Sequence, residues 1–300
     1  MRQVISRGQT FFAILGAAKC GTTSLASWLG RHRKIFMCEP KEPEFFNTDF
    51  RDRRTRYEKE YLGYFKAVCE THGAVGEASV LYLPSRVAVP ALLRWVPDAK
   101  FFVMVRNPVE MAMSLHAENL ASGIESETNF AKAWALQAQR RTGRGIPHSC
   151  LDPVLLQYGE MCRLGEQVSR LLSVVDKERV RVFTLDEMRA APVGVYVEAL
   201  GFLEIEDDGW REVPALNPRK VVAYPMLARF AKSCEIAKRA VGIRRGLGLL
   251  SVIRRVSYAV GSAQAISESV CAEMRSYFSE DVTLLGRLIG KDLSGWVRGY

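Results

Sequence analysis

Short apolar runs and helical patterns alternate along the chain. The continuous apolar run at residues 11–15 is typical of a strand buried on both faces, residues 99–105 are predicted as a second buried strand, and residues 180–185 form a third β-like run. The helices that the pattern predicts cover residues 22–29, 109–120, 155–174, 186–188, 192–201 and 267–289. Strands that alternate with helices predict an α/β fold of three layers, with a central parallel sheet between helices. No repeat or linker divides the chain, so we expect one domain over residues 1–300.

Two further segments carry signals of non-helical structure. Residues 73–77, with the sequence GAVGE, lead into a short loop. The segment from Cys38 to Phe46 holds Pro40 and Pro43, which stiffen the backbone and exclude a helix across it.

The composition is that of an ordinary globular protein. Hydrophobic residues make up 48% of the 300 residues and charged residues 25%, which excludes disordered, collagen-like and coiled-coil chains. Lysine and arginine number 42 against 33 acidic residues, so the formal net charge is 42 − 33 = +9. This excess suits an anionic ligand, and by itself leaves nucleotide, polyanion, nucleic acid and membrane surface open.

Cysteine usage indicates a reducing compartment. The seven cysteines include no C-x-x-C pair, and their odd number and wide spacing argue against both a disulfide framework and a zinc site. No apolar stretch is long enough to span a bilayer, and the run at residues 11–18 lacks a cleavage site. We therefore expect a cytoplasmic protein.

The loop between the first strand and the first helix carries the main chemical signal. Its sequence, GAAKCGTT at residues 16–23, places glycines and backbone N–H groups at a helix N-terminus, where an anion binds well. A Walker A loop ends in Gly-Lys-Ser/Thr, but Thr22 occupies the lysine position here and the only lysine is Lys19. Inside the loop, Lys19 would lie closer to the first phosphate after the sugar.

A second anion site is predicted after the strand at residues 99–105. No aspartate follows this strand; Arg106 does, and it is a poor magnesium ligand, which disfavours an ATPase or kinase. An arginine can grip a phosphate with two N–H groups, and Ser114 in the next helix adds a hydroxyl donor. Two phosphate sites imply a nucleotide phosphorylated at two positions, with no metal required.

These motifs resemble the sulfotransferases that use 3′-phosphoadenosine-5′-phosphosulfate (PAPS). The matching segments are GAAKCGTTSLASWL, FFVMVRNPVEMAMS, LYLPS after GEAS, and the C-terminal SYFSEDVTLLGRLIGKDLSGW. The pattern is closer to the carbohydrate-type members, including the heparan sulfate enzymes and bacterial relatives, and covers residues 11–296. The resemblance implies transfer of a sulfuryl group from PAPS to a hydroxyl of a carbohydrate or glycan-like acceptor, with 3′,5′-bisphosphoadenosine (PAP) as product.

The resemblance also implies which residues bind the donor. These are Lys19, Cys20, Gly21, Thr22, Thr23, Arg106, Ser114, Arg219 and Lys220. Met111 stands where relatives often have a second arginine.

For catalysis, the resemblance implies a carboxylate base three residues before two paired aromatics, which is Glu42 here, with Lys19 stabilising the leaving nucleotide. Glu44 and His116 are the alternative bases. The residues expected at the acceptor are Lys41, Glu44, Glu77, Ser79 and His116.

Other interpretations stay open. Basic residues between 229 and 255 form either an ordinary helix face or a pair of helices that touches a membrane surface, which would suit a lipid-linked acceptor. The first rival function is a P-loop nucleotide or small-molecule kinase that uses ATP. The second is a non-enzymatic nucleic-acid-binding protein, for which only the net charge speaks.

Overall fold

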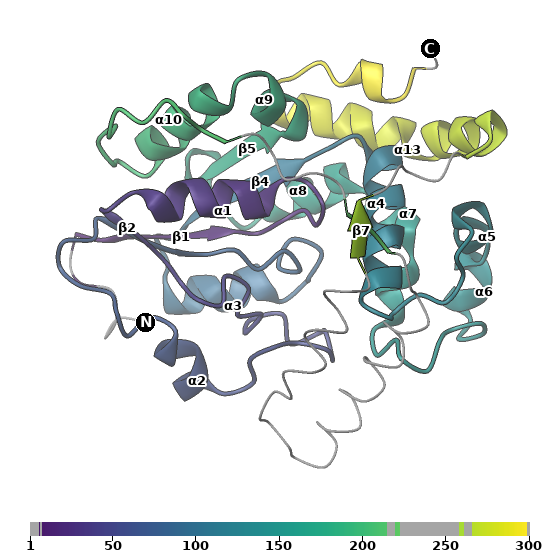
Figure 1. Cartoon of the computed structure of the whole chain (residues 1–300), viewed down its shortest axis with the longest axis horizontal. Helices are drawn as coiled ribbons and strands as arrows, with labels where there is room; N and C mark the ends of the chain where they lie inside the picture. The colour runs from purple at the N-terminus through teal and green to yellow at the C-terminus, as the bar shows by residue number, and fades with distance from the viewer. Residues whose placement is uncertain (1–5, 7, 215–219, 223–257, 261–265, 299–300) are drawn as a thin grey trace. The chain divides into compact units, whose positions relative to one another are not determined.

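The computed structural model describes residues 6, 8–214, 220–222, 258–260 and 266–298 (Figure 1). The chain forms two compact units, each described here by itself. The first comprises residues 1–106, 164–217 and 283–293, and the second comprises residues 107–163, 218–282 and 294–300. The prediction of one domain over residues 1–300 stays a prediction.

A five-stranded parallel sheet forms the centre of the first unit. Its strands are β1 (Thr10–Ile14), β2 (Ile35–Met37), β3 (Ala74–Glu77), β4 (Lys100–Val105) and β5 (Val180–Thr184). They lie in the order β2-β3-β1-β4-β5, and every neighbouring pair is parallel. All strands therefore end at one edge, which collects the segments that follow them. The predicted α/β fold with a central parallel sheet is confirmed.

Helices cover both faces of this sheet. The helices of the first unit are α1 (Thr22–Arg31), α2 (Glu58–Gly63), α3 (Ala88–Trp95), α8 (Leu164–Leu172), α9 (Leu185–Ala190) and α10 (Pro192–Phe202), with the 3-10 turn η2 (Lys177–Arg179). Figure 1 shows α1 and α10 on one face and α3 on the other. The chain crosses from β1 to β2 in one direction and from β3 to β4 in the other, so right-handed crossovers place α1 and α3 on opposite faces.

The second unit is mainly helical. Its elements are α4 (Pro108–Ala121), α5 (Phe130–Ala135), α6 (Gln137–Arg141), η1 (Pro153–Leu156), α7 (Tyr158–Met161), β6 (Lys220–Val222), β7 (Tyr258–Val260) and η3 (Ser294–Trp296). The long helix α13 (Glu268–Ile289) contributes residues to both units. Pro108 at the first turn of α4 and the Asn107 side chain, which accepts from the Val109 N–H at 3.0 Å, start α4 where the sequence predicts.

Residues 74–77, for which the pattern predicts only that they lead into a loop, form strand β3 between β2 and β1. Gly76 in this strand packs directly against a ring: a Cβ at Gly76 would lie 2.3 Å from Cζ of Phe12. One prediction about secondary structure is wrong, because the helix predicted over residues 155–174 is divided into η1, α7 and α8. The apolar residues of this stretch belong to two different units, because the boundary between the second and the first unit falls between Arg163 and Leu164.

Candidate active site

The loop between β1 and α1 is held by backbone hydrogen bonds to β4. The Ala17 N–H donates to the Met104 carbonyl oxygen at 2.7 Å, and the Met104 N–H donates to the Gly16 carbonyl oxygen at 2.6 Å. Gly16 has φ +134°, and a Cβ there would lie 2.7 Å from the carbonyl oxygen of Val80. Glycine is therefore required at this position, and the loop lies beside the end of β4.

The first turn of α1 offers backbone donors to a ligand. In the part of the chain that the structure describes, no acceptor lies within hydrogen-bond distance of the N–H groups of Gly21, Thr22 and Thr23. These N–H groups and the positive end of the helix dipole suit an anion. Cys20 is fully buried, and burial raises the pKa of its thiol to about 12, so the thiol stays protonated; its backbone N–H donates to the Ala17 carbonyl oxygen at 3.3 Å.

Lys19 and Arg106 meet at this loop. Lys19 is exposed, with φ +66°, and the Arg106 Nη1 donates to its backbone carbonyl oxygen at 3.3 Å. Of the predicted donor residues, the structure thus brings together Lys19 to Thr23 and Arg106 in the first unit. Such a pair of cations beside a helix N-terminus is suited to a doubly phosphorylated ligand.

The remaining predicted donor residues lie elsewhere in the chain. Ser114 and Met111 belong to the second unit, where both are buried on α4. Arg219 lies outside the described residues, and of Lys220 the structure describes only the backbone, at the start of β6.

Residues 38–46, called the carboxylate segment because they carry Glu42 and Glu44, continue from β2 along β3. The Cys38 N–H donates to the Gly76 carbonyl oxygen at 2.9 Å, and the Ala78 N–H donates to the Lys41 carbonyl oxygen at 2.7 Å. Beyond this point Lys41 and Glu42 form an ion pair with each other, and their side chains are about three-quarters buried, with 29% and 27% exposed. The sheet therefore carries Glu42 to the same edge as the loop.

A cleft of about 760 Å³ lies between α1 and the segment that carries Glu42. One wall is the exposed face of α1, and the other is the segment after β2 together with Arg54. Its lining residues are Thr23, Ala26, Ser27, Gly30, Arg31, Met37, Cys38, Glu39, Pro40, Lys41, Glu42 and Arg54. Thr23, in the first turn of α1, thus shares a cavity with the candidate base Glu42.

Glu44 occupies an unusual backbone conformation beside this cleft. It has φ +50°, and its carboxylate accepts a hydrogen bond from the Arg54 N–H at 3.1 Å. Burial and then the negative charge of Glu42 raise the pKa of Glu44 to about 7. A carboxyl group with such a pKa exchanges protons readily at neutral pH.

Glu77 and Ser79, which we expected near the acceptor, are fully buried with no exposed surface. Ser79 lies directly behind the carboxylate segment, because its hydroxyl accepts a hydrogen bond from the Glu44 N–H at 3.0 Å. Neither residue lines the cleft.

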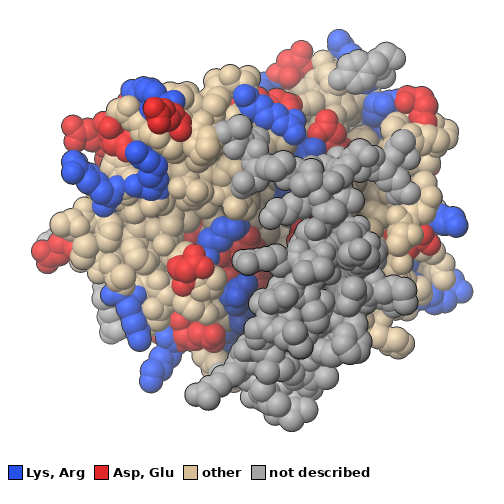
Figure 2. All heavy atoms as spheres, viewed as in Figure 1, with Lys and Arg blue, Asp and Glu red and all other residues tan. Residues whose placement is uncertain are grey.

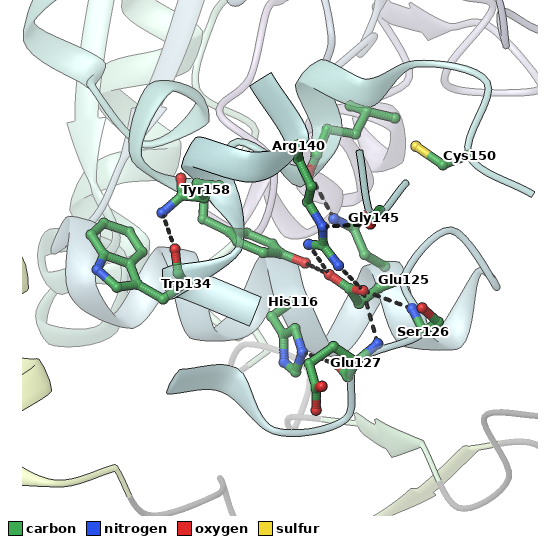
Figure 3. A network of polar contacts seen from close by, with 12 residues as sticks. His116, Glu125, Ser126, Glu127, Trp134, Arg140, Gly145, Cys150 and Tyr158 are labelled. Carbon is green, nitrogen blue, oxygen red and sulfur yellow. Dashed lines mark hydrogen bonds and ion pairs between the residues drawn. The ribbon is translucent and has the colours of Figure 1, made fainter. Parts of the chain in front are cut away.

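His116 belongs to a buried polar network of the second unit (Figure 3). Its Nε2 lies 2.7 Å from the Glu127 carbonyl oxygen, and its ring packs edge-on against Phe130 and Tyr158. The ring is 4% exposed, and burial lowers its pKa. These contacts favour the packed histidine over an acceptor-binding one.

The same network holds a fully buried ion pair. Arg140 donates from both terminal nitrogens to the two carboxylate oxygens of Glu125 at 2.6 Å, and the Tyr158 hydroxyl donates to Glu125 at 2.8 Å (Figure 3). Glu125 also accepts from the Ser126 and Glu127 N–H groups at 2.7 and 2.9 Å. The pair therefore fixes the turn that follows α4.

Sequence reasoning missed three residues around the carboxylate segment: Arg54, Tyr61 and Tyr82. Arg54 lies in the dense charged run at residues 51–59, which the sequence predicts to be either a solvated surface or a contact with an anionic glycan, and no local signal separates Arg54 from its neighbours. The two tyrosines contact the segment from positions more than ten residues away in sequence, and spacing alone cannot pair them.

The described residues show neither a metal site nor a membrane-spanning helix. No group of three or more His, Cys, Asp or Glu side chains among them is arranged to hold a metal ion. None of their helices is both long and apolar enough to cross a membrane.

Comparison with known proteins points to one class of enzyme. No protein-family profile matches the chain. A curated relative, membrane-associated sulfotransferase kil1 of Dictyostelium discoideum, is 30% identical over 103 residues, which are 34% of this chain. The matched region spans 21% of that relative's length.

A solved structure matches over nearly the whole chain. The sulfotransferase from Alicyclobacillus acidocaldarius is 27% identical with a TM-score of 0.72, covering 98% of this chain and 100% of that one. The structure of retinol dehydratase with androsterone and inactive cofactor PAP is 14% identical, covers 93% of this chain and 81% of that one, and has a TM-score of 0.44. Similarity that low carries no argument about this chain.

Proposed function

We propose, on the premise that this chain is a homologue of the sulfotransferases, that it transfers a sulfuryl group from PAPS to a hydroxyl of a carbohydrate or glycan-like acceptor. One observation carries the proposal: Thr23, in the first turn of the helix that follows the loop, lines the same cleft as Glu42, and the N–H groups of that first turn form no hydrogen bond among the described residues. An anion site beside a carboxylate supplies the two elements that in-line transfer to a hydroxyl needs.

The residues of the first unit fit the donor. The N–H groups of Gly21, Thr22 and Thr23 would bind the 5′-phosphosulfate, and Lys19 would stabilise the charge that develops on the bridging oxygen as it leaves. Arg106, already hydrogen-bonded to the loop, would bind the 3′-phosphate. The motif resemblance adds Ser114, Arg219 and Lys220 to the proposed donor residues; Ser114 and Lys220 belong to the second unit.

Glu42 is the proposed general base. It would take the proton of the acceptor hydroxyl as the oxygen–sulfur bond forms and the bond from sulfur to the 5′-phosphate breaks, which leaves PAP. The ion pair with Lys41 orients the Glu42 carboxylate at the cleft. Glu44, whose carboxylate is held by the Arg54 N–H, is the proposed acceptor contact and the alternative base.

The carbohydrate acceptor rests on the motif resemblance, and the cleft supports it with mixed polar lining. Thr23 and Ser27 offer hydroxyls, and Arg54 offers a guanidinium. Radiolabelled PAPS, tested against mono- and oligosaccharides, lipid-linked sugars, phenols and sterols, identifies the acceptor class. Label transferred to phenols or sterols alone would replace the carbohydrate proposal.

Two other functions remain as rivals, and one comparison separates them. Thermal stabilisation is measured with PAP, with ATP and Mg²⁺, and with an oligonucleotide, since a ligand that binds the native state raises the melting temperature. The proposal predicts stabilisation by PAP only. On the face in Figure 2, lysines and arginines of the described residues are interspersed with acidic side chains, which does not favour a nucleic-acid surface.

The proposal includes a cytoplasmic location, inferred from cysteine usage. The segment 229–255, which would contact a membrane surface, lies outside the described residues.

A further inference from the structure

Glu77 is a carboxyl group buried completely at the end of β3. The Tyr61 hydroxyl donates to its Oε1 at 2.7 Å, the Ser79 hydroxyl donates to its Oε2 at 2.7 Å, and the Tyr82 hydroxyl lies 3.5 Å from Oε1. Among the described residues, no lysine, arginine or histidine forms an ion pair with it. A buried carboxyl group supported by hydroxyls alone is costly, so its presence calls for a role.

Two of these hydroxyls also hold the carboxylate segment. The Ser79 hydroxyl accepts from the Glu44 N–H at 3.0 Å, and the Tyr82 hydroxyl accepts from the N–H groups of Phe45 and Phe46 at 3.0 and 3.3 Å. A hydroxyl has a single proton, and when it points at Glu77 the oxygen lone pairs face the backbone N–H groups. Glu77 thus orients the Ser79 and Tyr82 hydroxyl oxygens, which accept hydrogen bonds from the backbone N–H groups of three consecutive residues, 44–46.

These contacts hold a backbone that is strained locally. Glu44 has φ +50°, a conformation that costs a residue with a Cβ about 1–3 kcal/mol unless its surroundings impose it. Pro43 precedes it and restricts the chain between Glu42 and Glu44.

Glu42 is held from both sides by the residues that follow β3. On its N-terminal side the Ala78 N–H bonds the Lys41 carbonyl oxygen at 2.7 Å, and on its C-terminal side Ser79 bonds Glu44. Glu77, Ala78 and Ser79 are consecutive, so one short piece of backbone sets where the Glu42 carboxylate lies in the cleft.

We propose that Glu77 is a positioning residue that acts through the Ser79 and Tyr82 hydroxyls to place the Glu42 carboxylate for proton removal from the acceptor. This inference rests on the proposed function. It gives Glu77 and Ser79 a role behind the segment instead of the acceptor contact that the motif resemblance implies.

The test uses Ser79→Ala and Tyr82→Phe, with Tyr158→Phe as a matched control. Tyr158, like Tyr61, is a fully buried tyrosine whose hydroxyl donates to a fully buried glutamate, at 2.8 Å, but it lies in the second unit. Loss of the Tyr158 hydroxyl therefore measures how much stability the removal of a buried hydroxyl costs when the carboxylate segment is unchanged.

Turnover is measured in the full chain with radiolabelled PAPS and the best acceptor of the screen, or water where no acceptor works, and is expressed per PAP-binding site. We expect kcat to fall about 10- to 100-fold in Ser79→Ala, since a misplaced catalytic group costs that much. The KM for PAPS should stay within about twofold, because the donor loop is untouched. Tyr158→Phe should keep kcat within about twofold at a similar loss of melting temperature.

A kcat loss in Ser79→Ala and Tyr82→Phe no larger than in Tyr158→Phe would overturn the inference. A loss of kcat/KM that comes from a higher KM for PAPS, with kcat unchanged, would also overturn it. If the unmutated chain neither gains thermal stability from PAP nor transfers label, the proposed function fails first, and the inference with it.

Discussion

The Arg106 guanidinium donates a hydrogen bond to the backbone carbonyl oxygen of Lys19, with 3.3 Å between Nη1 and the oxygen. The contact joins the residue after β4 to the apex of the loop after β1, and these strands are neighbours in the sheet. Under the proposed function, the two cations hold opposite ends of one nucleotide.

Lys19→Ala should reduce kcat by about 100- to 1,000-fold, the usual cost of removing one group that stabilises charge in the transition state. Lys19 is exposed at the loop apex, so the melting temperature should change little. Steady-state rates and thermal melts of the variant check both parts. Near-normal turnover would remove Lys19 from the leaving group.

Arg106→Ala should weaken binding of PAP about 10- to 100-fold, since a charge-assisted hydrogen bond is lost. Adenosine 5′-phosphosulfate, which lacks the 3′-phosphate, serves as the control ligand in the same titration. Its affinity should fall much less. Equal losses for both ligands would assign Arg106 to the loop alone.

Glu42→Gln should lower kcat by about 100-fold or more with little effect on PAP affinity, because general bases typically contribute that much. Glu44→Gln is the matched variant, two residues away and with the same chemical change. It should raise the KM for the acceptor instead. The reverse outcome would make Glu44 the base.

The burial of Glu77 predicts a pH-dependent stability. Burial raises its pKa from about 4.5 to about 7, so the folded state retains a proton that the unfolded state releases. The stabilisation is therefore complete below pH 4.5 and is lost as the pH rises through 7, on the order of 3 kcal/mol. Urea unfolding at several pH values should show this loss in the unmutated chain and a smaller loss in Glu77→Gln, where the raised pKa of Glu44 still contributes. Parallel pH profiles for the two proteins would contradict it.

Glu125→Gln should destabilise the protein by about 3–5 kcal/mol, because it leaves the buried Arg140 without its counter-charge. Glu160→Gln is the control, since its ion pair with Arg141 is exposed and should contribute at most about 1 kcal/mol. Urea unfolding of both variants measures the difference. Equal effects would mean that Arg140 finds another partner.

The sequence predicted the donor half of the site better than the acceptor half. The strands β1, β4 and β5 are rich in apolar and β-branched residues, and the loop motif between β1 and α1 lies within a few residues, so the local pattern was sufficient. Strands β2 and β3 have three and four residues, and β3 contains Gly76, which lacks a side chain to register in any pattern. The carboxylate segment that contains Glu42 is positioned by these two short strands.

Long-range contacts explain the other omissions. Ser79 and Tyr82 bond amides more than thirty residues earlier in the chain, and Glu77 is buried at the end of a strand that lies between two others. Nothing near Glu77 in sequence distinguishes it from a glutamate in a cleft.

The position of β2 at the margin of the sheet, with β3 as its sole strand neighbour, has a consequence for how such an enzyme can change. The proposed donor loop follows β1, the middle strand of the sheet. The cleft wall that would face the acceptor follows β2, which is an edge strand. Insertions or substitutions in the segment after β2 disturb only the pairing of β2 with β3 and leave the proposed donor-binding loop intact. Acceptor preference is thus a separable module, open to redesign or to divergence under selection without rebuilding the donor half.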